Sequence, residues 1–233
     1  LGYKPPFLCP MGKETEANAA KRELARGSES DHVALVSALE GWQRERGRFA
    51  SRYFLSSQTL EYIGRLRSDL SDGARTLLQR LPADHTDPRY LADVLSATLV
   101  AGLYPNLAWL HRFGKGETCR GLKVVAHPGS VNARSSSALV VYYDIQETTE
   151  RYLYDTTHVQ MGPVLLFAAD LTLGKRTPTR TTLRVGGWTV ALETPAAEEL
   201  LALRRVLHEF IQRSVGAPPT EAHNVATDAL SRI

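Results

Sequence analysis

Residues 88–113 read PRYLADVLSATLVAGLYPNLAWLHRF, and within them the spacing of the apolar residues changes. As far as Leu103 these residues recur at intervals of three and four, which is the pattern of an amphipathic helix. Tyr104-Pro105 ends the pattern, because the residue before a proline disfavours helical dihedral angles. From Asn106 onward the period changes to two, as in a half-buried strand. The sequence therefore predicts a helical first part, joined at this point to a β-rich second part.

Four more helices are expected before this junction. The first segment is rich in Ala, Glu, Lys and Arg, which are good helix formers, and Ser30 is a suitable N-cap for the second. Apolar residues recur at helical spacing, so side chains such as Val36, Leu66 and Leu70 are expected to face a core. Trp42, Trp109 and Trp188 are expected as core anchors. The expected helices span 13–26, 30–46, 57–73 and 77–81.

After the junction we expect short strands separated by glycine-rich or polar turns, a pattern typical of a small barrel or sandwich. A last helix should begin at Thr194-Pro195 and end near residue 214, with a loose tail after it. The expected strands are 107–113, 121–127, 138–145, 151–156, 163–169 and 182–192.

Composition excludes several classes of protein. No apolar run approaches the roughly 20 residues that a membrane-spanning helix needs, so we expect no membrane contact. Cys9 and Cys119 are the two cysteines of the 233 residues, too few for a disulfide framework or a zinc site, and they favour a reducing compartment. Cytoplasm, nucleus and mitochondrion all fit. The first residue is not Met, so we expect a longer parent protein.

Catalytic motifs are missing from the sequence. It holds no phosphate-binding GxxxxGK[ST] loop, no Asp-Glu-Ala-His box, no HExxH and no GxSxG, so we expect no catalytic residue and no metal ligand. Asp155 and His158 lie three residues apart, where a turn hydrogen bond is favoured over a catalytic dyad. His127-Pro128 favours a turn-stabilising role. For Asp31-His32, capping of a helix is favoured over contact with RNA.

Positive charge gathers in the β-rich part. Residues 105–186 hold 10 Lys and Arg against 6 Asp and Glu. Cations and strand tyrosines together suit a groove for a single nucleic-acid strand, although strand tyrosines are more often core residues and surface cations are ordinary. The polar and basic side chains of these turns and strands are Lys115, Arg120, Lys123, Asn132, Arg134, Lys175 and Arg176, and the tyrosines are Tyr142, Tyr143, Tyr152 and Tyr154.

Seven stretches resemble, in the same order, the helicase-associated region of the DEAH/RHA-type (DExH-box) RNA helicases. They are PFLCPMGKE (6–14), SDHVALV (30–36) with Gly41-Trp42, YFLSSQTL (53–60), AGLYPN (101–106), HPGSVN (127–132), YLYDTT (152–157) and LLF (165–167). The branch of RNA helicase A and the G-quadruplex-resolving helicases looks most similar. Gly129 replaces a commoner polar residue within the family's HPxSV turn, although Ser130 is retained, and the hairpin 111–123 looks short for quadruplex specificity.

The resemblance implies an α+β fold, in which a ratchet-like helical bundle (1–104) precedes a five- or six-stranded OB-like β-barrel (105–193), a C-terminal helix (194–214) and a flexible tail (215–233). It implies the RNA-gripping C-terminal module of an ATP-dependent 3′–5′ RNA helicase, a hydrolase whose RecA-like domains are absent from this chain. With that function, the expected contacts with RNA are Lys115, Arg120, Lys123, Ser130, Asn132, Arg134, Lys175 and Arg176.

The resemblance also sets the expected ligands and partners. The chain itself would need no cofactor, whereas the parent would use ATP and Mg²⁺. Single-stranded or structured RNA, the parent's RecA-like domains and a large ribonucleoprotein assembly are the expected partners. Two alternatives stay open: a protein–protein docking module within such an assembly, and a stand-alone OB-type binding protein.

Overall fold

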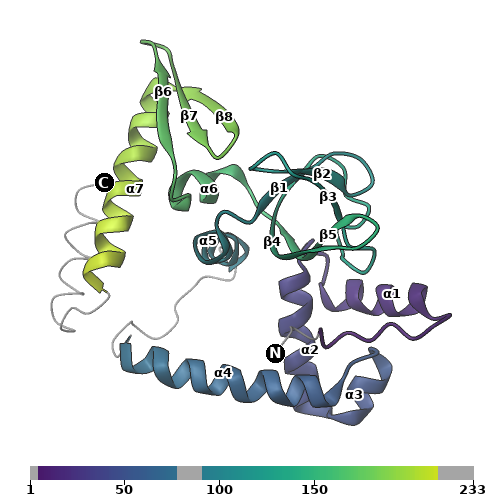
Figure 1. Cartoon of the computed structure of the whole chain (residues 1–233). Helices are drawn as coiled ribbons and strands as arrows, with labels where there is room; N and C mark the ends of the chain where they lie inside the picture. The colour runs from purple at the N-terminus through teal and green to yellow at the C-terminus, as the bar shows by residue number, and fades with distance from the viewer. Residues whose placement is uncertain (1–4, 78–90, 215–233) are drawn as a thin grey trace.

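The computed structural model describes residues 5–77 and 91–214. Helices begin and end the described chain and the strands lie between them, so the fold is α+β, as the sequence predicts (Figure 1). The helices are α1 (Glu14–Leu24), α2 (Asp31–Glu45), α3 (Gly47–Arg52), α4 (Ser57–Leu77), α5 (Leu91–Leu103), α6 (Met161–Phe167) and α7 (Thr194–Ser214). The strands are β1 (Leu107–Leu110), β2 (Lys115–Thr118), β3 (Lys123–Ala126), β4 (Ala138–Glu147), β5 (Arg151–His158), β6 (Thr172–Arg176), β7 (Arg180–Val185) and β8 (Trp188–Glu193).

Helices α1 to α4 surround a core of their own. Leu39 and Trp42 of α2 pack there with Leu60 of α4, and all three side chains are buried. The Trp42 indole N–H donates a 3.1 Å hydrogen bond to the Ser57 hydroxyl at the start of α4, so the polar atom of this buried ring has a partner. Trp42 is therefore a core anchor, as predicted.

Helix α4 differs from its prediction. It continues through Gly73, because a glycine inside a helix costs only about 1 kcal/mol and Gly73 does not adopt the positive φ that ends many helices. Leu66 and Leu70 are exposed instead of facing a core, because this half of α4 extends beyond α2 and α3 (Figure 1). Val36 of α2 is exposed as well. The short helix expected at 77–81 lies almost wholly outside the described residues.

Strands β1 to β5 close into a barrel in the order β1-β2-β3-β5-β4. Strands β3 and β5 are parallel, and the other neighbours are antiparallel. Leu110 and Leu153 are fully buried in its interior. Gly116 opposes Leu110, and a Cβ added to it would lie 2.1 Å from the Trp109 carbonyl oxygen, so only glycine fits. The predicted OB-like barrel is confirmed, although residues 115–118 form a strand where a turn was expected.

Residues after β5 do not continue the barrel. Residues 163–169, expected as a strand, lie mostly in α6, since a short apolar run does not distinguish a strand from a helix. The strand expected at 182–192 is the hairpin β7–β8, whose turn contains Gly186 with φ of +56°. Strand β6 completes a separate three-stranded sheet, β6-β7-β8. The domain boundaries at residues 104, 193 and 214 stay a prediction.

A second core joins the barrel to this sheet. Leu107 on the outside of the barrel and Leu183 of β7 are fully buried in it, together with Val164 of α6. Trp109 and Trp188 pack against the same core and are half-buried. The barrel wall formed by β1 and β4 is therefore covered by α5, α6 and the sheet.

Arg204 attaches α7 to the end of α6. Its guanidinium donates hydrogen bonds to the carbonyl oxygens of Leu165, Leu166 and Ala168 at 3.0, 2.6 and 2.6 Å. The last carbonyl groups of a helix have no partner within the helix and carry partial negative charge, so a guanidinium is well suited to them.

Replacing Arg204 by Met removes these three bonds and keeps an unbranched apolar stem. We expect the free energy of unfolding to fall by about 2 kcal/mol, because hydrogen bonds to a charged group contribute more than neutral ones. Urea unfolding measures the change, and Arg205→Met, on the exposed side of α7, is the matched control. Equal loss in both variants would contradict this role.

Candidate nucleic-acid interface

The loop between β3 and β4, residues 127–137, is held by one buried carboxylate. Asp31, at the first turn of α2, is 0% exposed. Its Oδ2 accepts hydrogen bonds from the Ser130 hydroxyl at 2.6 Å and from the Thr156 amide at 2.9 Å, and its Oδ1 accepts one from the Val131 amide at 3.0 Å. The Lys21 ammonium lies 2.9 Å from Oδ1. The helical part thus fixes the position of a barrel loop.

A second group of polar contacts lies beside the first. Ser30 caps α2 through a 3.1 Å bond from the Val33 amide, as predicted, and its hydroxyl also lies 2.7 Å from that of Thr157. The His32 Nδ1 lies 2.7 Å from the same Thr157 hydroxyl. Asp31-His32 therefore binds the chain's own barrel, with Ser30 as the cap.

Ser130 and Asn132 were candidate RNA contacts, but their side chains are buried, 4% and 1% exposed. Asn132 donates from Nδ2 to the Glu29 carbonyl oxygen at 3.0 Å and to the Thr156 hydroxyl at 2.9 Å. Both side chains are thus engaged inside the molecule. They position the loop, because a polar group in the interior needs an internal partner.

The β1–β2 turn lies directly against this loop. The Gly114 amide donates to the Ser135 carbonyl oxygen at 3.0 Å, and the Ser137 amide donates to the His111 carbonyl oxygen at 2.7 Å. Gly114 has φ of +68°, and a Cβ added there would lie 2.6 Å from the Ala133 carbonyl oxygen. The two loops therefore form a single rim at one end of the barrel.

Side chains suited to nucleic acid are exposed on this rim. Lys115, the first residue of β2, and Arg134, on the loop between β3 and β4, were both predicted and are both exposed. Arg112 and Phe113 were not predicted; Arg112 is exposed, and Phe113 is 75% exposed. An aromatic residue next to a Gly-Lys-Gly turn was the available signal, because a turn seldom buries a ring. We call Arg112, Phe113, Lys115 and Arg134 the barrel rim.

The other predicted cations lie elsewhere. Arg120 is in the β2–β3 turn at the opposite end of the barrel, beside the turn between β7 and β8. Lys123 forms an ion pair with Glu117 on the barrel wall. Lys175 and Arg176 belong to the separate sheet, where Arg176 pairs with Glu198 of α7. Of the eight predicted residues, the structure therefore exposes two together at the rim, Lys115 and Arg134, while Ser130 and Asn132 are buried within the same β3–β4 loop.

The four strand tyrosines do not form one surface. Tyr142 is buried inside the barrel, and this burial raises its pKa to about 12. The Tyr154 ring stacks on His127 with 4.4 Å between ring centroids, and Tyr152 meets the same imidazole edge-on. Tyr143 is 46% exposed. The alternative that tyrosines serve as core and cross-strand partners therefore holds for most of them.

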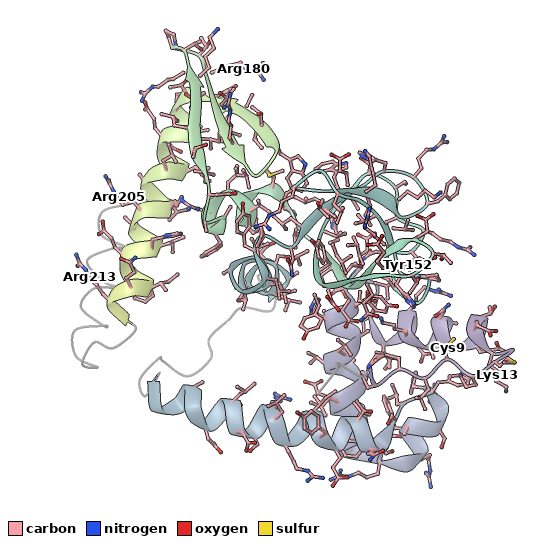
Figure 2. The ribbon with its side chains drawn as sticks, in the orientation of Figure 1. Cys9, Lys13, Tyr152, Arg180, Arg205 and Arg213 are labelled. Carbon is pink, nitrogen blue, oxygen red and sulfur yellow. The ribbon has the colours of Figure 1, made fainter. Side chains whose placement is uncertain are left out.

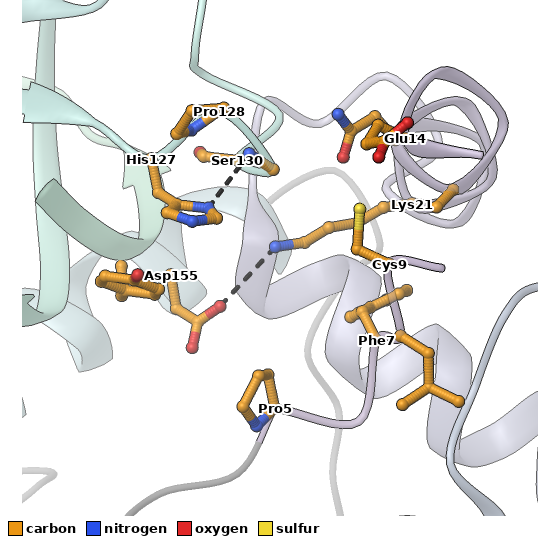
Figure 3. Close-up of a pocket in the computed structure, with 14 residues that line it drawn as sticks. Pro5, Phe7, Cys9, Glu14, Lys21, His127, Pro128, Ser130 and Asp155 are labelled. Atoms are coloured by element: carbon orange, nitrogen blue, oxygen red, sulfur yellow. Dashed lines mark hydrogen bonds and ion pairs between the residues drawn. The ribbon is translucent and has the colours of Figure 1, made fainter. Parts of the chain in front are cut away.

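A pocket of about 190 Å³ lies between the residues before α1, α1 itself and the His127-Pro128 turn (Figure 3). Lys21 extends across it, with its ammonium 3.7 Å from the Asp155 carboxylate. The Gly129 amide donates to His127 Nδ1 at 3.0 Å, which confirms the turn-stabilising role predicted for this histidine. The pocket is lined by residues of the helical part and of the barrel, so it belongs to the joint between them.

The described residues contain no group of three or more His, Cys, Asp or Glu that could hold a metal ion. Within the same residues, no helix combines the length and the apolar character required to cross a bilayer. For the pair Asp155 and His158, the Asp155 carboxylate lies 3.7 Å from the Lys21 ammonium, and the His158 Nδ1 lies 3.6 Å from the Glu29 carboxylate.

Replacing Asp31 by Asn keeps the shape of the side chain and removes its charge. We expect the free energy of unfolding to fall by about 3 kcal/mol, because Lys21 loses the nearer of its two carboxylate partners in a buried site and an amide nitrogen faces backbone donors. Chemical denaturation measures this loss. Glu29→Gln, on an exposed side chain two residues away, is the control, and a stable Asp31→Asn variant would contradict the role of the carboxylate.

Two histidines at the joint predict a dependence of stability on pH. Burial lowers the pKa of His32 and of His127, with a smaller contribution from Lys21, although Asp31 and Asp155 oppose the shift. As the pH falls below about 6.5 the unfolded chain protonates these rings, whereas the folded chain protonates them only at a lower pH. The unfolded state then binds more protons, so the free energy of unfolding decreases as the pH falls through this window. The stabilisation is fully present above the pKa of the unfolded chain.

Urea unfolding at about pH 7.5 and about pH 5.5 tests this expectation. The wild-type chain should be less stable at the lower pH, and His32→Gln should lose less stability between the two values. An equal loss in both would assign the effect to other groups.

Comparison with known proteins agrees with this geometry. Residues 95–171 match the family model for the oligonucleotide/oligosaccharide-binding (OB)-fold. The human ATP-dependent DNA/RNA helicase DHX36 is 31% identical in an alignment covering 94% of this chain and 24% of that protein. The Arabidopsis thaliana DExH-box ATP-dependent RNA helicase DExH1 is 36% identical over 73% of this chain and 19% of its own length.

The human ATP-dependent RNA helicase DHX29 is 27% identical over 95% of the chain. The chain spans between 18% and 24% of the length of these three relatives. The structure agrees with these matches: residues 107–158 form a closed five-stranded barrel. Helices contact one side of it, and a sheet with a helix contacts the other. The chain therefore belongs to the DEAH/RHA-type (DExH-box) RNA helicase family and represents its C-terminal helical and OB-fold region.

Proposed function

We propose that this chain is the RNA-gripping C-terminal module of an ATP-dependent 3′–5′ RNA helicase. In this proposal the barrel rim holds single-stranded RNA, while RecA-like domains elsewhere in the protein bind ATP and Mg²⁺ and move the strand. The observation that carries the proposal is the rim itself, where Phe113 is 75% exposed between cations.

The chemistry of the rim suits a single strand. Phosphates attract Arg112, Lys115 and Arg134, and each neutralised phosphate releases counterions, so affinity should decrease steeply with salt. Bases that are not paired offer a π-face, on which an exposed ring such as Phe113 can stack. A rim formed by two loops that are hydrogen-bonded to each other keeps these groups in fixed relative positions, which reduces the entropy lost on binding.

The joint supports the proposed coupling to a motor. The loop that carries Arg134 is bonded through Asp31 to α2, so a displacement of the helices would displace the rim. Force from RecA-like domains packed on the helical part would then reach the RNA through a buried ion pair and hydrogen bonds and not through a flexible linker.

A docking module within a large assembly is the second candidate, and α4 favours it. Tyr62, Leu66 and Leu70 are 61%, 43% and 65% exposed along this helix, and a row of exposed apolar side chains is often a contact with another protein. The two candidates are compatible, because α4 and the barrel rim lie on different parts of the molecule (Figure 1).

Variants of the rim in the full-length protein test the RNA proposal. Arg112→Ala with Arg134→Ala should reduce the slope of log affinity against log salt by about two, because two phosphate contacts are lost. Phe113→Ala should cost about 1–3 kcal/mol of binding free energy and leave the slope unchanged, because stacking releases no counterions. Fluorescence anisotropy with labelled single-stranded RNA at several salt concentrations measures both.

Arg205→Ala, which removes an exposed cation of α7, is the matched control and should change neither quantity. Unchanged RNA affinity in both rim variants would refute the proposal. If substituting Leu66 and Leu70 by Ser then released the protein from an assembly without changing its RNA affinity, the docking function would be favoured.

A further inference from the structure

The sheet formed by β6, β7 and β8 has two different faces. Thr181, Leu183 and Val185 of β7 are buried on the inner face, which packs against the second core and α7. Alternate side chains of a strand point to opposite faces, so Arg180 and Arg184 point outward, and both are exposed. No segment among residues 5–77 and 91–214 buries the two arginines.

The outer face carries small side chains and hydroxyl groups. A Cβ added to Gly174 would lie 2.5 Å from the Thr182 hydroxyl oxygen, so the two residues share this face and leave no room for a side chain on Gly174. Ala191 opposes Thr182 on the next strand. The middle of the face is therefore a row of small residues, and Thr172 and Thr189 flank Arg184 on either side.

The charge of this face is positive and mostly uncompensated. Between Thr172 and Val185 the sequence contains Lys175, Arg176, Arg180 and Arg184 and no acidic residue. Arg176 shares a register position with inward-facing Thr181 and pairs with Glu198 of α7, so it belongs to the inner side. Among the described residues no ion pair includes Lys175, Arg180 or Arg184.

Glu193 is the one acid on β8, and it opposes Arg180 in the register. It offsets part of the charge near the tip of the hairpin, whereas Arg184 has only threonines opposite it. Figure 2 shows Arg180 at the free end of the β6–β7 hairpin, which extends away from the barrel. This face is therefore distinct from the barrel rim.

We propose that the outer face of the β6–β7–β8 sheet binds the sugar–phosphate backbone of base-paired RNA. None of its side chains is aromatic, so it cannot stack on unpaired bases as the rim can. Arginines and hydroxyl groups around a row of small residues suit phosphates and ribose 2′-hydroxyls, through which proteins recognise the wide, shallow groove of an RNA duplex. The proposal rests on the proposed function and adds a second surface to it, for the part of the RNA that is still paired.

Binding by the full-length protein to two RNAs tests the proposal. One RNA is a single strand. The other carries the same single strand at one end of a hairpin duplex of about two helical turns, which is long enough to offer a surface of base-paired RNA. In Arg180→Ala/Arg184→Ala we expect about tenfold weaker binding to the hairpin RNA and a salt slope smaller by about two, with unchanged binding to the single strand.

Ala191→Glu, which places an acid in the middle of the outer face, should act in the same direction without removing any cation. Arg176→Ala, on the inner side of the same hairpin, is the matched control and should bind both RNAs as the wild type does. Near-wild-type melting temperatures for all variants would show that the exposed substitutions leave the fold intact.

The outcomes separate this proposal from the function it extends. Wild-type affinity of both outer-face variants for the hairpin RNA would overturn it, including the case in which the face binds a protein instead. Equal losses for the hairpin and the single strand would also overturn it, because the sheet would then be part of the single-strand grip. If rim variants lose single-strand affinity while the outer-face variants lose nothing, the proposed function stands and this inference fails.

Discussion

The Asp31 carboxylate is the contact on which the arrangement of the molecule depends. It is fully buried, and it accepts hydrogen bonds from a loop 99 residues further along the chain and from strand β5, with Lys21 as its counter-ion. A buried charge is tolerated only where such partners surround it. Helices and barrel must therefore meet in one geometry, because any other would take from this buried carboxylate the hydrogen-bond donors that the barrel supplies. The position of the barrel rim depends on this contact, because Asp31 is bonded to the loop that carries Arg134.

Periodicity was sufficient for much of the fold and insufficient for the rest. The change of period at Tyr104-Pro105 predicted the junction between helices and barrel, and Ser30 was correctly predicted as a cap. Residues 163–169 were assigned to a strand because an apolar run carries no period of its own. Gly73 did not end α4, since a glycine ends a helix only where the backbone turns left-handed. Such errors follow from local signals whose outcome tertiary contacts decide.

The candidate site illustrates a different limit. A motif names residues without showing which way they face, and the partners of Ser130 and Asn132 are distant in sequence. Their inward orientation could not be read from the turn itself. Phe113 is the opposite case, an apolar side chain that sequence reasoning assigns to a strand and the structure exposes. Lys115 and Arg134 could be suspected as cations, but only the hydrogen bonds between their loops place them side by side.

The parallel pair β3–β5 closes the barrel, and it is short, with Val125 opposite Tyr152 and Ala126 opposite Leu153. By contrast, β4 and β5 pair over seven positions. Ser130 follows β3 and Thr156 belongs to β5, and both donate hydrogen bonds to Asp31. The helical part therefore connects the two strands of this short pair. If α2 were detached, the β3–β5 pair would be the place where the barrel opens first, and its amide hydrogens would exchange with solvent before those of the other strand pairs.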